Sequence, residues 1–368
     1  MRCFISNLKI QPKGQKENPL YLVLIATLVL ASLSPSEADK EVNVYSHRHY
    51  DADRLLFKKF TVKTGIVVNV VKASADQLIK RLEIEGDYSP ADLLITVDAG
   101  RLYRAQQKEL LQPVESAILK SQVPEHLRDP DGHWYGLTIR ARVIVYSKER
   151  VDPEQLSTYE SLAEPQWKGK VLVRSSQNIY NQSLMASTIV AHGSEGARTW
   201  AKGLVSNFAR TPKGNDRDQV KAIASGVGDV AIVNTYYIGK LLNSDDESEQ
   251  KAGSKVEIFF PNQLDRGTHI NISGAGVTKS AKNLENAVKL LEFLSSLEAQ
   301  QAFAEANFEY PVNPQVEKPT LVKSWGEFKA DRINLSLLGK HNFEATKIFA
   351  QSNLAMRLKM PNHPLAGF

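Results

Sequence analysis

Four tyrosines and one histidine stand where segments with the pattern of buried strands give way to helical segments. They are His49, Tyr50, Tyr180, Tyr236 and Tyr237. The preceding apolar segments are 41–46, 170–175 and 229–235, with a short polar loop before the tyrosine that follows the second. Because ligands of open α/β sheets bind beyond the carboxyl ends of the strands, these side chains are candidates for one shared binding site.

Phenol groups in such positions can bind a strongly acidic metal ion. The ordinary pKa of tyrosine is about 10, so the phenol ligates only a cation that displaces its proton. Fe(III) is such a cation, whereas Zn²⁺ and Cu⁺ favour histidine and cysteine, and Ca²⁺ and Mg²⁺ favour carboxylate clusters, of which the sequence shows none. Each tyrosine alone is more often a packing or surface aromatic, so the combination is what predicts an Fe(III) site.

A charge-balancing arginine is expected beside such a site. Four phenolates and one neutral imidazole around Fe³⁺ would leave one net negative charge, which is costly to bury unless it is paired. Arg140 and Arg142 lie on the same face of the long alternating segment 136–147, and Arg140 is the preferred candidate. Either arginine could instead be an ordinary charge at the rim of the site.

The elements that must position these residues alternate between strand-like and helical patterns. Near-continuous apolar strands between amphipathic helices predict an α/β fold with parallel strands covered on both faces. The expected strands are 41–46, 66–71, 91–98, 170–175, 229–235 and 256–260, and the expected helices are 51–64, 75–85, 99–111, 182–207, 216–225, 284–295 and 298–307. Two longer extended segments, 136–147 and 268–279, fit strands that cross between lobes. The sequence therefore predicts a two-lobe clamshell with two hinge crossings and a ligand cleft between the lobes.

Both lobes are expected to be discontinuous, because the chain leaves and returns through the crossings. The first lobe is predicted to comprise 39–139 with 268–316, and the second 140–267 with 317–349. A length of 368 residues agrees with two domains, since single cores stop growing beyond about 250–300 residues. The tail 350–368 is too short for a further domain, and no role is assigned to it.

The N-terminal segment 1–38 has the order of a Sec-type signal peptide. Three lysines between positions 9 and 16 precede the apolar run 20–31, and small residues near position 38 fit a cleavage site before Asp39. The run is shorter than the roughly 20 residues that a membrane-spanning helix needs, although an uncleaved anchor is the alternative. No twin arginine and no cysteine directly after the run are present, which argues against Tat export and lipidation.

The composition excludes several kinds of site. The only cysteine, Cys3, lies in the expected signal peptide, so the mature chain would have no disulfide, thiolate metal site, Fe–S cluster or cysteine nucleophile. The net charge is +5 and the basic residues are scattered, which does not predict nucleic-acid binding.

Several segments resemble the periplasmic ferric-iron-binding proteins of ABC-type iron importers, and most closely their cyanobacterial branch. The segments that carry the resemblance are NVYSHRHYDAD, DLLITVDAGRLY, HWYGLTIRARVIVYS, GDVAIVNTYYIGKL, HINISGAGVTK and KSAKNLENAVKLLEFLSSLEAQQAFAEANFEYPVNP. The resemblance runs from about residue 41 to about residue 348. It implies a periplasmic-binding-protein fold, Fe(III) as cargo, a periplasmic location, a monomeric chain, and an inner-membrane ABC permease with its ATPase as partners.

The resemblance also implies roles for single residues. Tyr236 and Tyr237 match the paired phenolate ligands of the second lobe, Tyr180 matches the third tyrosine, Tyr50 matches the tyrosine of the first lobe, His49 matches a histidine that ligates in only some members, and Arg140 matches the charge-balancing arginine. Another branch of the family uses a first-lobe glutamate together with an exogenous anion. Glu83 and Glu85 lie in a helix without the matching context, so we expect a site made by protein side chains that needs no bound anion.

Three other functions compete with iron transport. A solute-binding protein for a small organic molecule or anion would use the same fold, with the tyrosines stacking or hydrogen bonding. Sequestration that protects against free iron is a variant within the iron class. A metal-dependent hydrolase using His47 and His49 is disfavoured, because the sequence has no H-E-x-x-H motif, no G-x-S-x-G motif and no bridging carboxylate set. We therefore expect a binding protein and not an enzyme.

Overall fold

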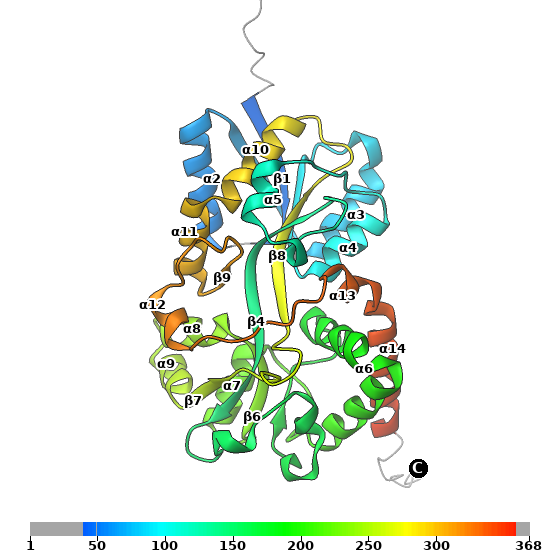
Figure 1. Cartoon of the computed structure of the whole chain (residues 1–368), viewed down its shortest axis with the longest axis vertical. Helices are drawn as coiled ribbons and strands as arrows, with labels where there is room; N and C mark the ends of the chain where they lie inside the picture. Colours follow the sequence, from blue (N-terminus) through cyan, green and yellow to red (C-terminus); the bar gives the residue numbers. More distant parts are fainter. Residues whose placement is uncertain (1–39, 49, 358–368) are drawn as a thin grey trace, which may run out of the picture. The chain divides into compact units, whose positions relative to one another are not determined.

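The computed structural model describes residues 40–48 and 50–357, with one compact unit that begins at Glu41 (Figure 1). The strands are β1 (Glu41–Ser46), β2 (Val67–Lys72), β3 (Leu93–Val97), β4 (Tyr135–Ser147), β5 (Val171–Leu172), β6 (Val230–Asn234), β7 (Val256–Phe259), β8 (Ile270–Val277) and β9 (Tyr310–Pro311). The α-helices are α2 (Asp51–Thr64), α3 (Ala75–Glu85), α4 (Ala99–Gln107), α5 (Ala117–Gln122), α6 (Ile179–Ser206), α7 (Asp216–Ala224), α8 (Tyr236–Leu242), α9 (Glu247–Ser254), α10 (Leu284–Ser295), α11 (Leu297–Asn307), α12 (Thr320–Ser324), α13 (Ser336–Lys340) and α14 (Asn342–Arg357). The expected signal peptide, His49 and the end of the tail lie outside the described residues.

The strands form one connected set in the order β2-β1-β3-β8-β4-β6-β5, with β7 and β9 also paired to β4. β1 is parallel to both β2 and β3, and β5 is parallel to β6, as the alternation of strands and helices predicts. The two crossing strands differ, because β8 runs antiparallel to β3 and β4 runs antiparallel to β8 and β6. A chain that crosses between lobes and then returns must run in opposite directions, which agrees with the prediction that these two long segments are crossings and not buried parallel strands.

The two crossings join the lobes of a mixed α/β fold, which confirms the predicted fold class. β4 pairs with β8 over Tyr135–Ala141 and with β6 over Arg142–Tyr146, so one strand belongs to both groups of strands. Figure 1 shows β4 and β8 side by side, with α2, α3, α4, α10 and α11 at one end and α6, α7, α8, α9 and α14 at the other. The predicted boundaries of the lobes in the sequence stay a prediction.

Several elements begin or end at other residues than expected, and one difference matters for the site. Segment 170–175 forms only the short strand β5, and α6 begins at Ile179. The side chain of Asn178 accepts a hydrogen bond from the backbone N–H of Tyr180 and so caps this helix. Tyr180 therefore stands in the first helical turn and not in a loop, and the helix fixes the direction of its side chain.

Close packing between helices is visible at two glycines. A Cβ atom on Gly339 of α13 would lie 2.4 Å from Cβ of Tyr103 on α4. A Cβ atom on Gly239 of α8 would lie 2.5 Å from Cγ of Phe308, the residue that ends α11 with φ of 59°. At both positions hydrogen is the only substituent that fits without movement of the neighbour.

Within the described part of the chain, every helix is too short or too polar to cross a lipid bilayer.

Candidate metal centre

Three phenol groups converge where β6 leads into α8. Tyr236 and Tyr237 are the first two residues of α8, and their ring centroids are 4.3 Å apart with an interplanar angle of 31°. The hydroxyl oxygen of Tyr180, in the first turn of α6, lies 3.3 Å from that of Tyr236. The first turns of α6 and α8 therefore bring three tyrosines of one lobe together.

All four predicted tyrosines line one cavity of about 310 Å³. Its walls are formed by His47, Arg48, Tyr50, Val97, Tyr180, Asn215, Arg217, Tyr236, Tyr237 and Lys240. Tyr50 stands between β1 and α2, in one lobe, whereas the other three tyrosines stand at α6 and α8, in the other lobe. The structure thus brings the predicted tyrosines together from both lobes, while His49 is the predicted site residue that it does not describe.

Burial raises the pKa of three of the cavity phenols. Burial raises the pKa of Tyr236, which is 2% exposed, well above the ordinary value, and the neighbouring tyrosines raise it further. Burial also raises the pKa of Tyr50, with Glu309 adding to the effect, and raises the pKa of Tyr237 to about 12. A ligand that binds through these oxygens has to displace protons, which demands a cation of high charge density.

Positive side chains flank the phenols, and the sequence analysis did not single out two of them. Lys240 Nζ lies 3.9 Å from the ring centroid of Tyr50 and 5.4 Å from that of Tyr236, and burial lowers the pKa of Lys240 to about 8. Arg48 Cζ lies 5.0 Å from the Tyr50 ring centroid. Lys240 follows Tyr236 by four residues, one helical turn, and this spacing could have pointed to it.

Arg140 is buried on β4 next to the tyrosine cavity. Its Nη2 donates a hydrogen bond of 2.7 Å to Ser273 Oγ, its Nε lies 4.0 Å from Glu309 Oε1, and its Cζ lies 5.8 Å from the ring centroid of Tyr180. Burial opposes its charge, but Glu309 and the neighbouring tyrosines outweigh that effect and raise the pKa of Arg140. It remains a cation directly behind the phenols.

Arg142 is also buried on β4, but other groups bind it. Its Nη1 lies 3.1 Å from Asp216 Oδ2 and 2.9 Å from Asn234 Oδ1, and its Nη2 donates to Asn181 Oδ1 over 2.7 Å. Cζ of Arg142 lies 5.9 Å from the Tyr180 ring centroid. Both predicted arginines therefore border the site, and Arg142 has its own carboxylate partner.

A buried carboxylate close to the cavity is a residue that the sequence analysis missed. Glu309 is 1% exposed, and its Oε2 lies 3.5 Å from Arg48 Nη1 while its Oε1 faces Arg140. Neither Glu83 nor Glu85 lines the cavity. Glu83 pairs with Lys80 and Lys108 instead.

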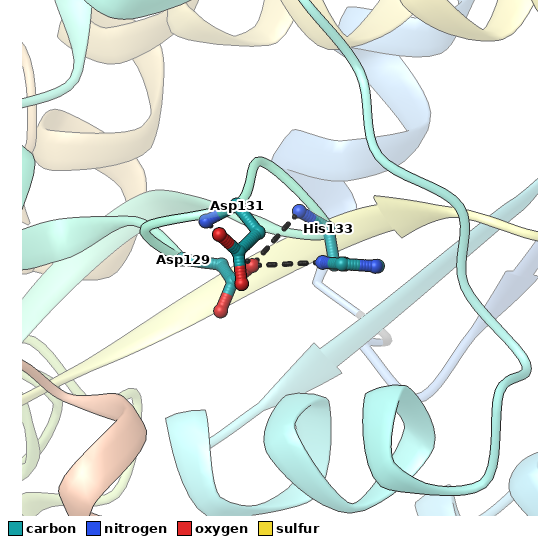
Figure 2. Close-up of side chains that lie close together, drawn as sticks. All are labelled: Asp129, Asp131 and His133. Carbon is teal, nitrogen blue, oxygen red and sulfur yellow. Dashed lines mark hydrogen bonds and ion pairs between the residues drawn. The ribbon is translucent and has the colours of Figure 1, made fainter.

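Outside the cavity, one cluster of Asp and His side chains has the composition of a cation site. Figure 2 shows Asp129 Oδ2 accepting hydrogen bonds from the ring Nδ1 of His133 at 2.9 Å and from its backbone N–H at 3.1 Å. The same oxygen accepts from the backbone N–H of Asp131 at 3.2 Å. These bonds account for the cluster as a turn that leads into β4, so we assign it no metal.

Comparison with known proteins identifies the family of this chain. The family described as bacterial extracellular solute-binding protein matches residues 89–328. Iron uptake protein A1 of Synechocystis is 53% identical over 319 residues, which cover 87% of this chain and 88% of that protein.

Two solved structures extend the comparison. Trichodesmium IdiA (FutA) in complex with iron and citrate ligands is 51% identical and has a TM-score of 0.83, with coverage of 85% of this chain and 99% of that one. Apo FutA2 from Synechocystis is 50% identical and has a TM-score of 0.82, with coverage of 85% and 98%. The chain therefore belongs to the bacterial extracellular solute-binding protein family and is a relative of the Synechocystis iron uptake proteins.

Proposed function

We propose that this chain is a ferric-iron-binding protein that captures Fe(III) in the tyrosine cavity. The observation that carries the proposal is that Tyr50, Tyr180, Tyr236 and Tyr237 line one cavity although they come from different lobes. Its relatives include an iron uptake protein of Synechocystis and a Trichodesmium protein whose structure holds iron and citrate.

In this proposal the four phenolates are the ligands of the metal ion, and His49 is a candidate fifth ligand. The three tyrosines of α6 and α8 bind Fe(III) first, because the hydroxyl groups of Tyr180 and Tyr236 and the rings of Tyr236 and Tyr237 already lie together. Tyr50 completes the set from the other lobe, so that metal binding and lobe closure are linked. Arg140, with Arg142 behind it, offsets the net negative charge of the filled site.

Membership of the solute-binding protein family suggests where the protein acts and which proteins receive its iron. We propose that the protein is exported by its N-terminal signal peptide, acts as a monomer in the periplasm, and delivers Fe(III) to an ABC permease and its ATPase. Nothing in this function requires catalysis, so the chain is a carrier and not an enzyme. Protective sequestration of iron uses the same site and differs only in whether a permease accepts the cargo.

A second candidate function is the binding of a small anion, and the positive charges of the cavity wall favour this function. Arg48, Arg217 and Lys240 line the cavity together with the phenols. An anion would be held by these cations, and the tyrosines would donate hydrogen bonds without losing their protons. The two candidates therefore differ in the state of the phenols when the cargo is bound.

A visible absorption spectrum of the iron-loaded protein tests the proposal. Phenolate bound to Fe(III) gives a charge-transfer band that colours the protein reddish, and a ferric chelator should remove the band. Tyr236→Phe and Tyr50→Phe should each weaken the band and lower iron affinity at least tenfold, while Tyr88→Phe, an exposed tyrosine outside the cavity, should change neither. A colourless protein that still holds iron would contradict phenolate ligation, and unchanged iron affinity in Tyr236→Phe would leave the anion as cargo.

A further inference from the structure

A second cavity lies on the other face of the crossing strands. It measures about 690 Å³, and Ile139 of β4 and Ile270 of β8 form its floor. Their neighbours Arg140 and Asn271 point to the opposite face and line a small pocket beside Tyr180. Side chains alternate along a strand, so this rear cavity and the tyrosine cavity are separated by the two crossing strands.

One segment of chain forms the outer wall of the rear cavity. In Figure 1 the trace between α12 and α13 runs across β4 and β8. The backbone N–H of Thr268 donates to Lys329 O over 2.8 Å, and the N–H of Asp331 donates to Thr268 O over 2.9 Å. Gly267 has a φ of 93°, and a Cβ there would lie 2.7 Å from the backbone of Ala330. The segment is therefore bound tightly to the start of β8, and the rear cavity has a fixed wall.

Aromatic and proline residues make one side of the cavity apolar. The ring centroids of Tyr310 and Phe328 are 5.3 Å apart in an edge contact, and Phe328 stacks on Phe260 with centroids 4.4 Å apart. Pro311 and Pro314 line the same cavity. These rings offer a rigid surface for an apolar group.

The polar lining of the cavity is positively charged. It contains His126, Arg266, Lys318, Lys329 and Arg332, and no aspartate or glutamate side chain belongs to the lining within the described residues. Carboxylates outside the lining pair with two of these cations, Glu160 and Asp331 with Arg266 and Glu327 with Lys318.

Two of the cations remain without a carboxylate partner. Lys329 Nζ donates to the neutral backbone oxygen of Asp265, and Arg332 has no ion pair among the described residues. The charge of Arg332 is close enough to His126 that, after burial, it is the second cause that lowers the pKa of that histidine. Arg332 and Lys329 thus give the cavity uncompensated positive charge.

Two buried donors in the lining also lack an acceptor. The hydroxyl of Tyr310, a residue 4% exposed, and Nε of Arg266 form no hydrogen bond with any described group. Both atoms are inaccessible to solvent, so recognition of a ligand in the cavity depends on the exposed cations and not on these two donors.

We propose that the rear cavity binds a small organic anion, a carboxylate attached to an apolar body. The carboxylate lies between Arg332 and Lys329, and the apolar body rests against Phe328, Tyr310 and Pro311. This site is separate from the tyrosine cavity, and the proposal holds whether or not iron is the cargo there.

Titration calorimetry of the purified iron-free protein at low ionic strength tests the site with three probes. Benzoate carries both the charge and the ring, benzamide has the same shape without the charge, and acetate has the charge without the ring. We expect benzoate to bind one site with a Kd on the order of 1 mM or below, and the other two at least tenfold more weakly.

Variants locate the binding. Arg332→Gln and Lys329→Gln should each weaken benzoate binding about fivefold or more, whereas Arg217→Gln, the same change in the tyrosine cavity, should leave it unaltered. Tyr310→Phe keeps the ring and removes only a hydroxyl that solvent does not reach, so it should bind benzoate as the wild type does. Absence of benzoate binding, equal binding of benzamide, or sensitivity to Arg217→Gln in place of Arg332→Gln would each overturn the proposal.

Discussion

The ammonium group of Lys240 lies 3.9 Å from the ring centroid of Tyr50, in contact across the tyrosine cavity. Lys240 belongs to α8, which carries two of the other tyrosines, while Tyr50 comes from the opposite lobe. The contact is a cation–π interaction in a buried setting, and such contacts contribute on the order of 1–2 kcal/mol. It links the lobes at the place where the proposed metal ion would join them.

Replacing Lys240 should weaken iron binding. When Fe³⁺ displaces four phenol protons, the net charge of the site falls by one unit, so a neighbouring cation stabilises the filled site. At about 6 Å and an effective dielectric constant of about 20 this is worth on the order of 3 kcal/mol, or about a hundredfold in affinity. Lys240→Gln should show this loss in competition with a ferric chelator, and Lys251→Gln on the exposed face of α9 should not. Tighter iron binding by Lys240→Gln would mean that repulsion of the metal ion dominates.

Iron affinity should fall as the pH falls. The raised pKa values of Tyr50, Tyr236 and Tyr237 mean that the free protein keeps these protons at neutral pH, so binding must release them. Protons and iron then compete, and affinity is greatest at high pH and decreases with acid. A pH-stat at pH 7, with iron supplied as a ferric chelate and the protons taken up by the freed chelator added back, should record about four protons released per iron bound by the wild type and about three by Tyr236→Phe. Release of fewer than two protons would contradict a shell of four phenolates.

An added methyl group at Gly239 should disturb the contact between the lobes. Alanine is normally about 1 kcal/mol better than glycine inside a helix, but here its Cβ would lie 2.5 Å from Cγ of Phe308. Gly239 directly precedes Lys240, and Phe308 directly precedes Glu309, which pairs with Arg48, so movement of either partner shifts a residue of the cavity wall. Gly239→Ala should lower iron affinity about tenfold, as measured by chelator competition. Gly253→Ala in α9, where the nearest atom is at 3.2 Å, is the matched control and should bind iron normally. Normal iron binding by Gly239→Ala would show that the iron-bound form does not need this contact.

His269 should make the iron-free protein less stable in acid. Burial first, and then the charges of Arg266 and Arg142, lower the pKa of His269 to about 3 from an ordinary value of about 6.5. Between these values the unfolded chain binds a proton that the folded chain does not, so this contribution to stability is complete above about pH 6.5. It is lost as the pH falls towards 3, by at most about 1.4 kcal/mol per pH unit.

Urea unfolding of wild type and His269→Gln between pH 7.5 and 4.5 measures this effect. The free energy of unfolding of the wild type should fall more steeply with decreasing pH than that of the variant. The difference in slope should correspond to about one extra proton bound when the wild type unfolds. Parallel curves for wild type and His269→Gln would mean that His269 takes up its proton in the folded protein.

The convergence of the tyrosines could be predicted from the sequence because it depends on local order. Tyr50 and the pair Tyr236–Tyr237 each follow an apolar strand, and the fold brings these strand ends to one cleft. Tyr180 lines the same cavity, although it stands on a helix where a loop was expected. In each case the spacing between strand and tyrosine is short and visible in the chain.

The surroundings of the tyrosines could not be predicted in the same way. Glu309 meets Arg48 across 261 positions of sequence, and nothing local marks either residue as a partner of the other. The contact of Lys240 with Tyr50 likewise depends on how the lobes meet. Antiparallel pairing of β4 and β8 follows from the path of the chain between lobes, which strand propensity alone does not encode.

The two buried arginines of β4 bind different parts of the fold. Arg140 is bound to Ser273 and faces Glu309, whereas Arg142 is bound to Asp216 and Asn234. A rotation of the lobes that keeps both sets of bonds has to be absorbed by the backbone torsions on either side of Ala141, the single residue between them. Two arginines that stand two residues apart on one strand therefore hold different elements, with Ser273 on β8 and Asp216 at the start of α7.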